Sequence, residues 1–408
     1  MPLQTELCAL FDPARHEPLT QVSWSDAAAG TAIQHIVDDA MQAFSPDGLW
    51  PTHELDEPPT PDARYSMLYL GAGGVIWALR RLAQLGFGRD PAGRFDATVP
   101  TLVQRNREFG DAQLGASSYL LGDAGLLLLE WQMFHEPAIA ERIFTVVQDN
   151  LHHPTREMLW GSPGTLLAAI HMAESTGDPR WAQLFERGAR ILLDEMVLDE
   201  SLGIWLWHQD LAGKTRCYLG AAHGFVGNIH PMLRGAALLP EPLVQIFTER
   251  ALQTLSALAL HADGLLNWHP VHDPAAPVSK LPLVQDCHGA PGTVSRLATA
   301  PRSEQWDGLL NGAGELVWRA GPLTKGAGLC HGTAGNGLAL LKLWTRTGDP
   351  RWLARAQAFA MHAIEQVERE RQVRGHGRYS LWTGDIGVAL YLWSCLRGES
   401  SIPTLDVF

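Results

Sequence analysis

The stretch KGAGLCHGTAGNGLALLKLW, residues 325–344, contains the pattern on which the whole chain is built. A Gly-x-x-Gly turn, Gly332 to Gly335, is followed by a run that is apolar on nearly every side. A helix of that composition must be buried on most sides. Directly before the turn stand Cys330 and His331, two adjacent side chains that bind soft metal ions. The stretch therefore predicts a buried helix that begins at a turn with candidate metal ligands.

The same turn, followed by an Ala/Leu-rich run, recurs along the chain. The first glycines of the seven copies are Gly71, Gly122, Gly161, Gly224, Gly289, Gly332 and Gly384. The intervals leave room for one outgoing and one returning helix per copy. Residues 180–195 and 351–368, which lie between copies, alternate apolar and charged side chains at helical spacing. That alternation is typical of an outer helix with one face in water.

One junction between helices is repeated letter for letter, as TGDPRW at residues 176–181 and again at 347–352. Glycine suits the position after a helix, aspartate caps the start of the next helix, and proline fits its first turn. Each copy is therefore expected to end one helix and begin another.

These patterns predict an all-α fold, an α/α toroid (double α-barrel) with seven inner and seven outer helices. Every Gly-x-x-Gly turn would face the same end of the barrel. We expect one toroid domain over residues 1–408, in which 1–62 form an N-terminal extension and linker with a helix from about Ala27 to Phe44 and a Pro-rich segment at 57–61. Short hairpins are expected within residues 198–217 and 263–284.

Composition limits the classes of partner. The 408 residues have a net charge of −13 and a pI near 5.7, which argue against nucleic acid and against an anionic membrane surface. Neither a signal peptide nor an unbroken apolar run of membrane-spanning length is evident, so we expect a cytoplasmic protein. Five cysteines without a Cys-x-x-Cys pair do not indicate a disulfide framework.

A second Cys-His-Gly motif, Cys287-His288-Gly289, stands at the same place in its repeat as Cys330-His331-Gly332. Catalytic zinc sites use three protein ligands and leave one position open, and two cysteines with one histidine form an established set. The motifs predict Zn²⁺ bound by Cys287, Cys330 and one of the two histidines. The spacing does not choose between His288 and His331.

Two thiolates and a neutral imidazole balance the charge of Zn²⁺, so the site suits activation of a thiol; activation of water is the competing use. Addition of a thiolate to an alkene also needs a proton donor, and His223 stands before the turn glycine of a neighbouring copy. Lys325 is a candidate for binding an anionic group of the substrate. Glu157 is a weaker candidate, as an acid/base or as a peptide-binding residue.

At these residues the chain resembles the lanthionine synthetase C-like family. The motifs are LGAAHG (219–224), VQDCHGAPG (284–292) and LTKGAGLCHGTAGNG (323–337). The resemblance implies an α/α barrel with seven inner helices and zinc bound by Cys287, Cys330 and His331. It also implies an acid/base role for His223 and an anion-holding role for Lys325, as in the glutathione-using branch.

Two departures from the family pattern bear on function. Asp286 stands where an aromatic residue, often Trp, precedes the first zinc cysteine, and residues 281–286 lack the arginine found there in the cyclases. We expect zinc-dependent addition of a thiol, from a peptide cysteine or glutathione, to dehydroalanine or dehydrobutyrine in a dehydrated peptide or protein. The alternative is a zinc-containing scaffold or sensor that binds thiols or peptides without turnover.

Overall fold

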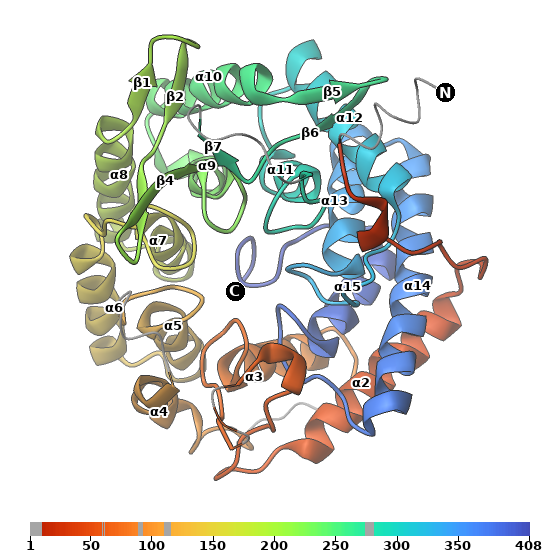
Figure 1. The fold of residues 1–408 in the computed structure, drawn as a ribbon. Helices are drawn as coiled ribbons and strands as arrows, with labels where there is room; N and C mark the ends of the chain where they lie inside the picture. Colours follow the sequence, from red (N-terminus) through yellow and green to blue (C-terminus); the bar gives the residue numbers. More distant parts are fainter. Residues whose placement is uncertain (1–9, 59, 61, 89–92, 110–115, 274–280) are drawn as a thin grey trace.

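Two concentric layers of helices form a closed ring in the computed structural model, which describes residues 10–58, 60, 62–88, 93–109, 116–273 and 281–408 (Figure 1). Within these residues the inner helices are α3 (Ala72–Gln84), α5 (Asp123–Phe134), α7 (Ser162–Thr176), α9 (Phe225–Arg234), α11 (Ala290–Leu297), α13 (Thr333–Thr347) and α15 (Asp385–Arg397). The outer helices are α2 (Asp26–Ala43), α4 (Leu102–Phe109), α6 (Pro137–Asp149), α8 (Pro179–Asp194), α10 (Glu241–Leu258), α12 (Glu304–Ala320) and α14 (Pro350–Arg374). The predicted α/α toroid, with seven helices in each layer, is confirmed.

Short strands occupy the connections between α8 and α9 and between α10 and α11. They are β1 (Val197–Asp199), β2 (Ile204–Leu206), β3 (Gln209–Leu211), β4 (Lys214–Tyr218), β5 (Leu260–Ala262), β6 (Leu265–Asn267) and β7 (Val271–His272). β1 pairs with β2 and β5 with β6, while β4 lies between β3 and β7, and all pairings are antiparallel. The expected hairpins are therefore present. Four 3-10 turns complete the described elements: Pro13–Arg15, Glu54–Asp56, Val99–Thr101 and Ala236–Leu238.

The second glycine of each Gly-x-x-Gly turn is required by a close approach of backbone. A Cβ atom at any of the seven positions would overlap the carbonyl oxygen of the residue three before the first glycine. Those carbonyls belong to Leu68, Tyr119, Met158, Ala221, Asp286, Leu329 and Leu381. All seven turns therefore meet the same requirement, whether or not they carry a functional side chain.

Neighbouring turns are joined to one another by backbone hydrogen bonds. In each bond both residues lie two positions before the first glycine of their turn. The N–H to C=O pairs are Tyr69 to Leu120 (3.0 Å), Trp382 to Tyr69 (3.2 Å), Cys330 to Trp382 (2.8 Å), Cys287 to Cys330 (3.0 Å) and Ala222 to Cys287 (3.2 Å). We call these six linked turns the turn arc. The arc fixes the spacing between turns that are far apart in sequence.

The repeated TGDPRW junction has the predicted structure in both copies. Gly177 and Gly348 end α7 and α13 in the left-handed conformation, with φ of 67° and 70°. Asp178 and Asp349 cap the next helices by accepting a hydrogen bond from the backbone N–H two residues on. The tryptophan that ends each motif is buried. Identical letters thus produce identical helix ends.

The N-terminal segment belongs to the ring and also contacts the loop before the Cys330 turn. Helix α2 lies against α15 and α14 as an outer helix. Arg15 accepts a backbone hydrogen bond from Thr324 at 3.0 Å, and Glu17 donates one to Pro322 at 3.0 Å. The segment predicted as an extension thus holds the backbone next to Lys325. Cys8 and two prolines of the predicted linker, Pro59 and Pro61, lie outside the described residues.

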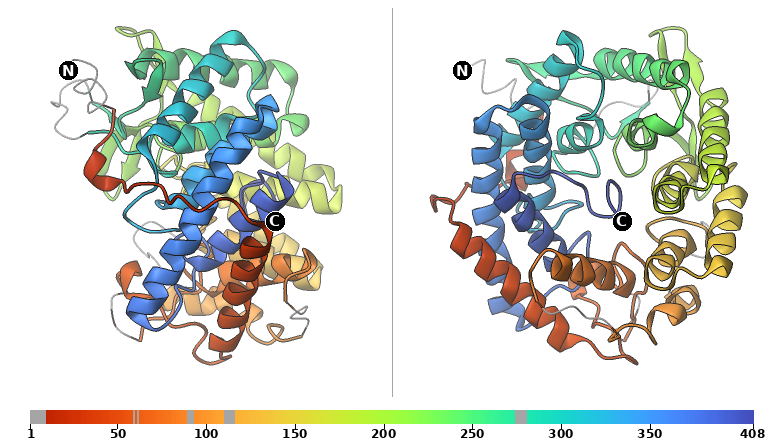
Figure 2. Two further views of the ribbon diagram at one scale, coloured as in Figure 1. Left: turned by 90° about the vertical axis from the view of Figure 1, so that its right-hand side faces the viewer. Right: turned by 180° about the vertical axis from the view of Figure 1, so that it is seen from behind.

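Residues 399–408 turn back into the middle of the ring (Figures 1 and 2). Asp406 is held by Lys342 at 2.5 Å and by His230 at 3.4 Å, and its carbonyl accepts a hydrogen bond from Arg234 at 2.9 Å. Burial opposes ionisation, but the charge of Lys342 and the interaction with His230 outweigh it and hold the pKa of Asp406 well below its usual range. The ring of Phe408 packs against Trp77. This segment, the central tail, connects inner helices across the barrel.

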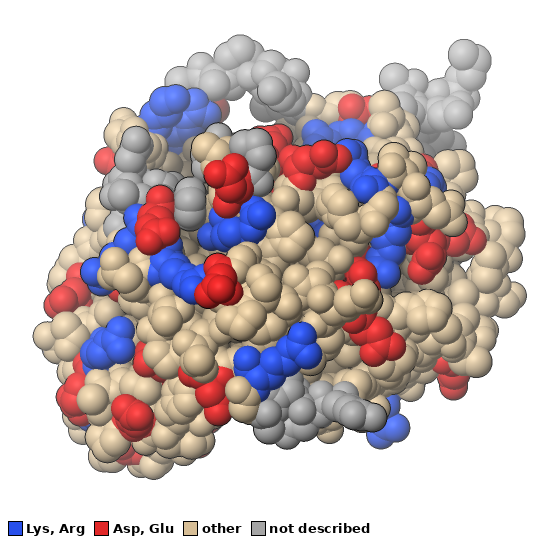
Figure 3. Space-filling view, turned by 90° about the horizontal axis from the view of Figure 1, so that it is seen from below, with Lys and Arg blue, Asp and Glu red and all other residues tan. Residues whose placement is uncertain are grey.

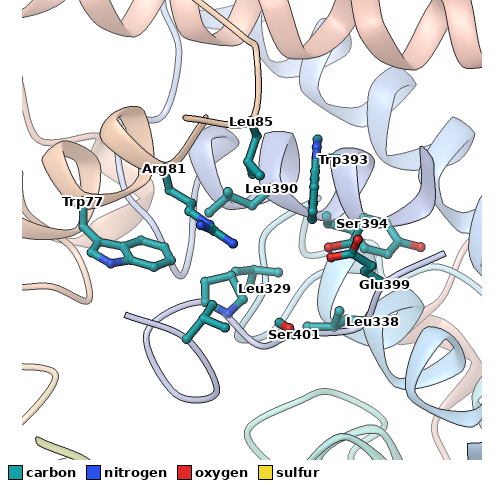
Figure 4. Close-up of a pocket in the computed structure, with 13 residues that line it drawn as sticks. Trp77, Arg81, Leu85, Leu329, Leu338, Leu390, Trp393, Ser394, Glu399 and Ser401 are labelled. Atoms are coloured by element: carbon teal, nitrogen blue, oxygen red, sulfur yellow. The ribbon is translucent and has the colours of Figure 1, made fainter. Parts of the chain in front are cut away.

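The central tail leaves small hollows beside it. One is lined by Trp77 and Arg81 of α3, by Trp393 of α15 and by Leu329 (Figure 4), and its volume of about 30 Å³ holds no more than about two or three waters. A larger hollow of about 360 Å³ lies on the side of α5 and α7. In the described part of the chain, no helix combines the length and apolar character that a bilayer crossing requires.

The glycine requirement gives the first prediction. Gly125→Ala in α5 forces the new methyl group against the carbonyl of Tyr119 and the side chain of Leu68. We expect unfolding free energy to fall by about 1–3 kcal/mol, as in other overpacked sites, measured by urea denaturation. Gly308→Ala in α12 is the control: no described atom lies within 4 Å of its Cβ, so about 0.5–1 kcal/mol of stabilisation is expected. Equal midpoints for the two variants would contradict the packing explanation.

Candidate metal centre

Three of the predicted ligands come together at the turns before α11 and α13. The ligand atoms of Cys287, Cys330 and His331 all lie within 4.8 Å of one another. Both cysteines are buried, and His331 is partly exposed. His288 is not part of this group; its ring lies 5.8 Å from that of His223. The turn arc creates the cluster, because the Cys287 N–H donates directly to the Cys330 carbonyl.

The donor set fits zinc in both geometry and charge. Tetrahedral zinc with Zn–S near 2.3 Å and Zn–N near 2.0 Å separates its ligand atoms by about 3.5–3.8 Å. Small movements of the three side chains would bring their ligand atoms to these separations. A hydrogen bond from the Cys330 thiol lowers the pKa of Cys287 despite burial, and the amide of Gln285 adds to this effect. The pKa of Cys330 is raised, because its thiol donates that hydrogen bond, is buried, and lies beside the negative charge of Cys287. A divalent cation would stabilise both thiolates.

The unusual acid beside the first cysteine is neutralised inside the protein. Asp286 accepts hydrogen bonds from Arg296 at 3.0 and 2.7 Å and from Ser295 at 2.9 Å. Both charged side chains are buried, with side-chain exposures of 4% for Asp286 and 3% for Arg296. The Arg296 guanidinium also lies 5.9 Å from the ring centre of Trp382, whose carbonyl binds the Cys330 N–H. This pair therefore supports both cysteine turns.

His223 is oriented by Glu157 from the turn before α7. The two side chains are 3.0 Å apart, Nδ1 to Oε2. Glu157 is fully buried and also accepts backbone hydrogen bonds from Leu159 and Trp160. Burial disfavours the imidazolium ion, but the hydrogen bond and charge of Glu157 outweigh burial, so the pKa of His223 is raised. Glu157 thus keeps the proton on Nδ1 of His223, and Nε2 of the same ring is free of this hydrogen bond.

Aromatic rings surround this part of the turn arc. Trp160 stacks on His223 at 5.6 Å with a 20° angle between ring planes, and Tyr218 lies 6.3 Å away from it. On the other side of the cysteines, Tyr69 stacks on Trp382 at 6.2 Å and 15°. The rings provide apolar surface beside His223 and the two cysteines.

Lys325 lies on the exposed loop before the Cys330 turn. It lines a shallow pocket with His53, Arg371 and Arg378. Its positive charge also contributes to the lowered pKa of Cys287, as the smallest of the causes. Lys325 is therefore exposed and close enough to act on Cys287 through its charge, while the pocket it lines includes none of the three candidate ligands.

Four residues near the cysteines were missed by the sequence analysis: Tyr69, Gln285, Arg296 and Trp382. Comparing the seven turns position by position would have found three of them. Tyr69 and Trp382 occupy the same place in their turns as Cys287, two residues before the glycine. Gln285 occupies the place of Glu157, four residues before the glycine. Arg296, inside α11, has no such positional signal.

Removing Arg296 should be costly, because it leaves the Asp286 carboxylate buried without a partner. We expect Arg296→Met to lower the unfolding free energy of metal-free protein by about 3–5 kcal/mol, and Asp286→Leu combined with Arg296→Met to recover most of that loss. Chemical denaturation of the two variants measures both values.

An exposed ion pair is the matched control for this experiment. Arg190 pairs with Glu186 on the surface of α8, so Arg190→Met should cost less than about 1 kcal/mol. A similar small loss for Arg296→Met would mean that the buried pair does not stabilise the cysteine turns.

Comparison with known proteins identifies the family of the chain. The profile described as "Lanthionine synthetase C-like protein" matches residues 52–407. "Glutathione S-transferase LANCL1" of Danio rerio is 27% identical over 337 residues, which cover 76% of this chain and 80% of that protein. "LanC-like protein GCL1" of Arabidopsis thaliana is 41% identical over 135 residues, 31% of this chain and 30% of that protein.

A solved structure, that of nisin cyclase, shares the fold with a TM-score of 0.61 at 13% identity, over 80% of this chain and 88% of the other. The family profile spans most of the chain, including every turn of the turn arc. The chain is therefore a member of the lanthionine synthetase C-like family.

Proposed function

We propose that this protein catalyses zinc-dependent addition of a thiol to dehydroalanine or dehydrobutyrine residues, which forms a thioether. The observation that carries the proposal is the meeting of Cys287, Cys330 and His331 beside the His223–Glu157 pair. Membership of a family that includes a glutathione S-transferase by name, and a fold shared with a cyclase, support carbon–sulfur chemistry of this kind.

Cys287, Cys330 and His331 are the residues that would hold the metal. Zinc bound there would offer an open fourth position and would keep a thiol deprotonated at neutral pH. Asp286 adds no net charge to this position, because Arg296 neutralises it. That neutralisation favours turnover over the scaffold role, since a free carboxylate would have opposed an incoming thiolate.

His223 has the properties of the proton donor. As the thiolate sulfur bonds to the β-carbon, the alkene π electrons move to the α-carbon as a carbanion. His223 then transfers a proton to that carbon. The thiol has released its own proton to solvent on forming the thiolate, and His223 takes up one proton from solvent, so the addition neither gains nor loses a proton overall. Glu157 raises the pKa of His223 and holds the ring, which keeps the donor form populated near neutral pH. Glu157 is thus a positioning residue.

Glutathione is the thiol that we favour over a peptide cysteine. Lys325 is exposed and its charge acts on Cys287, which supports a role in binding a carboxylate of glutathione. The partner in the reaction is a dehydrated peptide or protein. Acidic and basic side chains are interspersed on the face seen in Figure 3, unlike a surface for nucleic acid. We place the protein in the cytoplasm, where its four described cysteines, all free, would stay reduced.

Zinc content and thioether formation can be tested in one experiment. Purified protein should contain one zinc per chain and should add glutathione to a dehydroalanine peptide over many turnovers, read as a mass increase. Cys330→Ala should lose the zinc and at least about a hundredfold in rate, because thiol activation by a metal contributes several kcal/mol.

Cys217→Ala is the control, since Cys217 lies in β4 outside the metal group; it should keep both zinc and rate. Full activity of Cys330→Ala would contradict the mechanism. Tight binding of glutathione or peptide without product would support a scaffold instead.

The pH dependence of kcat tests the roles of His223 and Glu157. The active form of His223 is protonated, so kcat should be highest below its raised pKa and should fall as pH rises through it. Glu157→Gln removes the charge that raises this pKa, so the fall should move to lower pH. His223→Ala should lower kcat by about 10²–10⁴-fold, the usual contribution of a general acid.

Rates between about pH 5 and 9 would show the shift. Glu249→Gln on the surface helix α10 serves as control and should leave the profile in place. An unchanged pH dependence of kcat in Glu157→Gln would show that His223 is not the proton donor.

A further inference from the structure

Each of the two cysteine sulfurs has a neutral side chain with a donor group beside it. The Gln285 side-chain amide donates to Cys287 Sγ at 2.8 Å. Burial, and after it the nearby sulfur of Cys330, raises the pKa of the Tyr69 hydroxyl, so this hydroxyl lies beside that sulfur. The two donors come from different turns, and neither is used by the proposed mechanism.

The Gln285 donor is fixed by its own turn. Its N–H and C=O form a reciprocal pair of backbone hydrogen bonds with His288, at 3.2 and 3.0 Å, so the chain closes tightly around Cys287. The side chain of Gln285 is buried. Glu157 occupies the equivalent position of its own turn and accepts a hydrogen bond from His223. Gln285 instead presents N–H, where a carboxylate would repel a thiolate.

The Tyr69 donor reaches Cys330 across an intervening turn. The backbone of Tyr69 is held on both sides, by Leu120 at 3.0 Å and by Trp382 at 3.2 Å. Its ring lies flat on that of Trp382, and the Trp382 carbonyl binds the Cys330 N–H at 2.8 Å. The turn arc and the stacked ring together hold Tyr69 near the Cys330 turn.

These donors bear on a side reaction that the proposed mechanism makes possible, the alkylation of the protein's own cysteines. An electrophilic alkene must react with the sulfur of the substrate while two thiolate sulfurs of the protein lie beside it. A hydrogen bond to a thiolate withdraws electron density from its lone pairs and so lowers its nucleophilicity. A neutral donor does this without changing the net charge of the donor set.

We infer that Gln285 and Tyr69 are specificity residues, which suppress alkylation of Cys287 and Cys330 and so direct the addition to the substrate thiol. This inference rests on the proposed function, because it supposes an electrophilic substrate at the cluster. The part that concerns sulfur reactivity can be measured without turnover.

Iodoacetamide is the probe. A thiolate displaces iodide from it, so that a carbon–sulfur bond forms, a carbon–iodine bond breaks and iodide leaves with the electron pair. We expect Gln285→Met to raise the alkylation rate of Cys287, and Tyr69→Phe that of Cys330, by about three- to tenfold, the factor that corresponds to one ordinary hydrogen bond. Peptide mass spectrometry of zinc-loaded protein reads each cysteine separately.

Cys217, which is partly exposed in β4, is an internal reference within every sample and should react at the same rate in all of them. Zinc content and melting temperature are measured alongside. If one variant fails to fold, the other still tests the inference, since the two donors act on different sulfurs. Gln285→Glu adds a second measurement at the same site and should also raise the rate at Cys287.

Unchanged alkylation of Cys287 and Cys330 in folded, zinc-loaded variants would overturn the inference. Faster alkylation in both variants supports it. If the variants are alkylated faster but the parent protein forms no thioether, the effect of the donors on the sulfurs is supported and the proposed function is rejected. Failure of the inference can therefore be distinguished from failure of the proposed function. With a dehydroalanine peptide and glutathione, the variants should also accumulate peptide-alkylated enzyme, which the parent protein should not.

Discussion

The rest of the structure depends on one steric constraint, the contact between a turn carbonyl and the α-carbon of the second glycine in each repeat. Because no side chain fits there, all seven turns adopt the same close approach to their inner helices. Residues two positions before the first glycine then come into register, and six of the turns are joined by backbone hydrogen bonds. The ring closes through local geometry that is repeated, and not through one large contact.

A shared backbone with variable side chains explains how the site is assembled. The position two before the glycine supplies Cys287, Cys330, Tyr69 and Trp382, while the next position supplies the histidines. Charges are balanced close to where they arise: Arg296 neutralises Asp286, and Glu157 stabilises protonated His223. The candidate metal ligands can therefore lie in a largely buried setting without an uncompensated carboxylate beside them.

Repeat period and helix-end chemistry were enough to predict the toroid, the junctions and the hairpins, because these follow from local sequence. The two Cys-His-Gly motifs likewise indicated the metal cluster. The preference for His331 over His288 came from family resemblance, since both histidines have the same local setting. Tyr69 was missed because its side chain reaches across a neighbouring turn. Helix α2 was assigned to an extension because its inner neighbour, α15, lies at the other end of the sequence.

The central tail affects how a substrate can reach the cysteines. A ring of helices with an open middle would have two entrances, and a long peptide could be threaded from one to the other. Here Asp406 contacts His230 of α9 and Lys342 of α13, and Phe408 packs against α3, so the central tail occupies the middle of the ring. A peptide could not be threaded through the ring without displacing this segment. We therefore expect substrates to reach the cysteines from the end of the barrel that carries the turns.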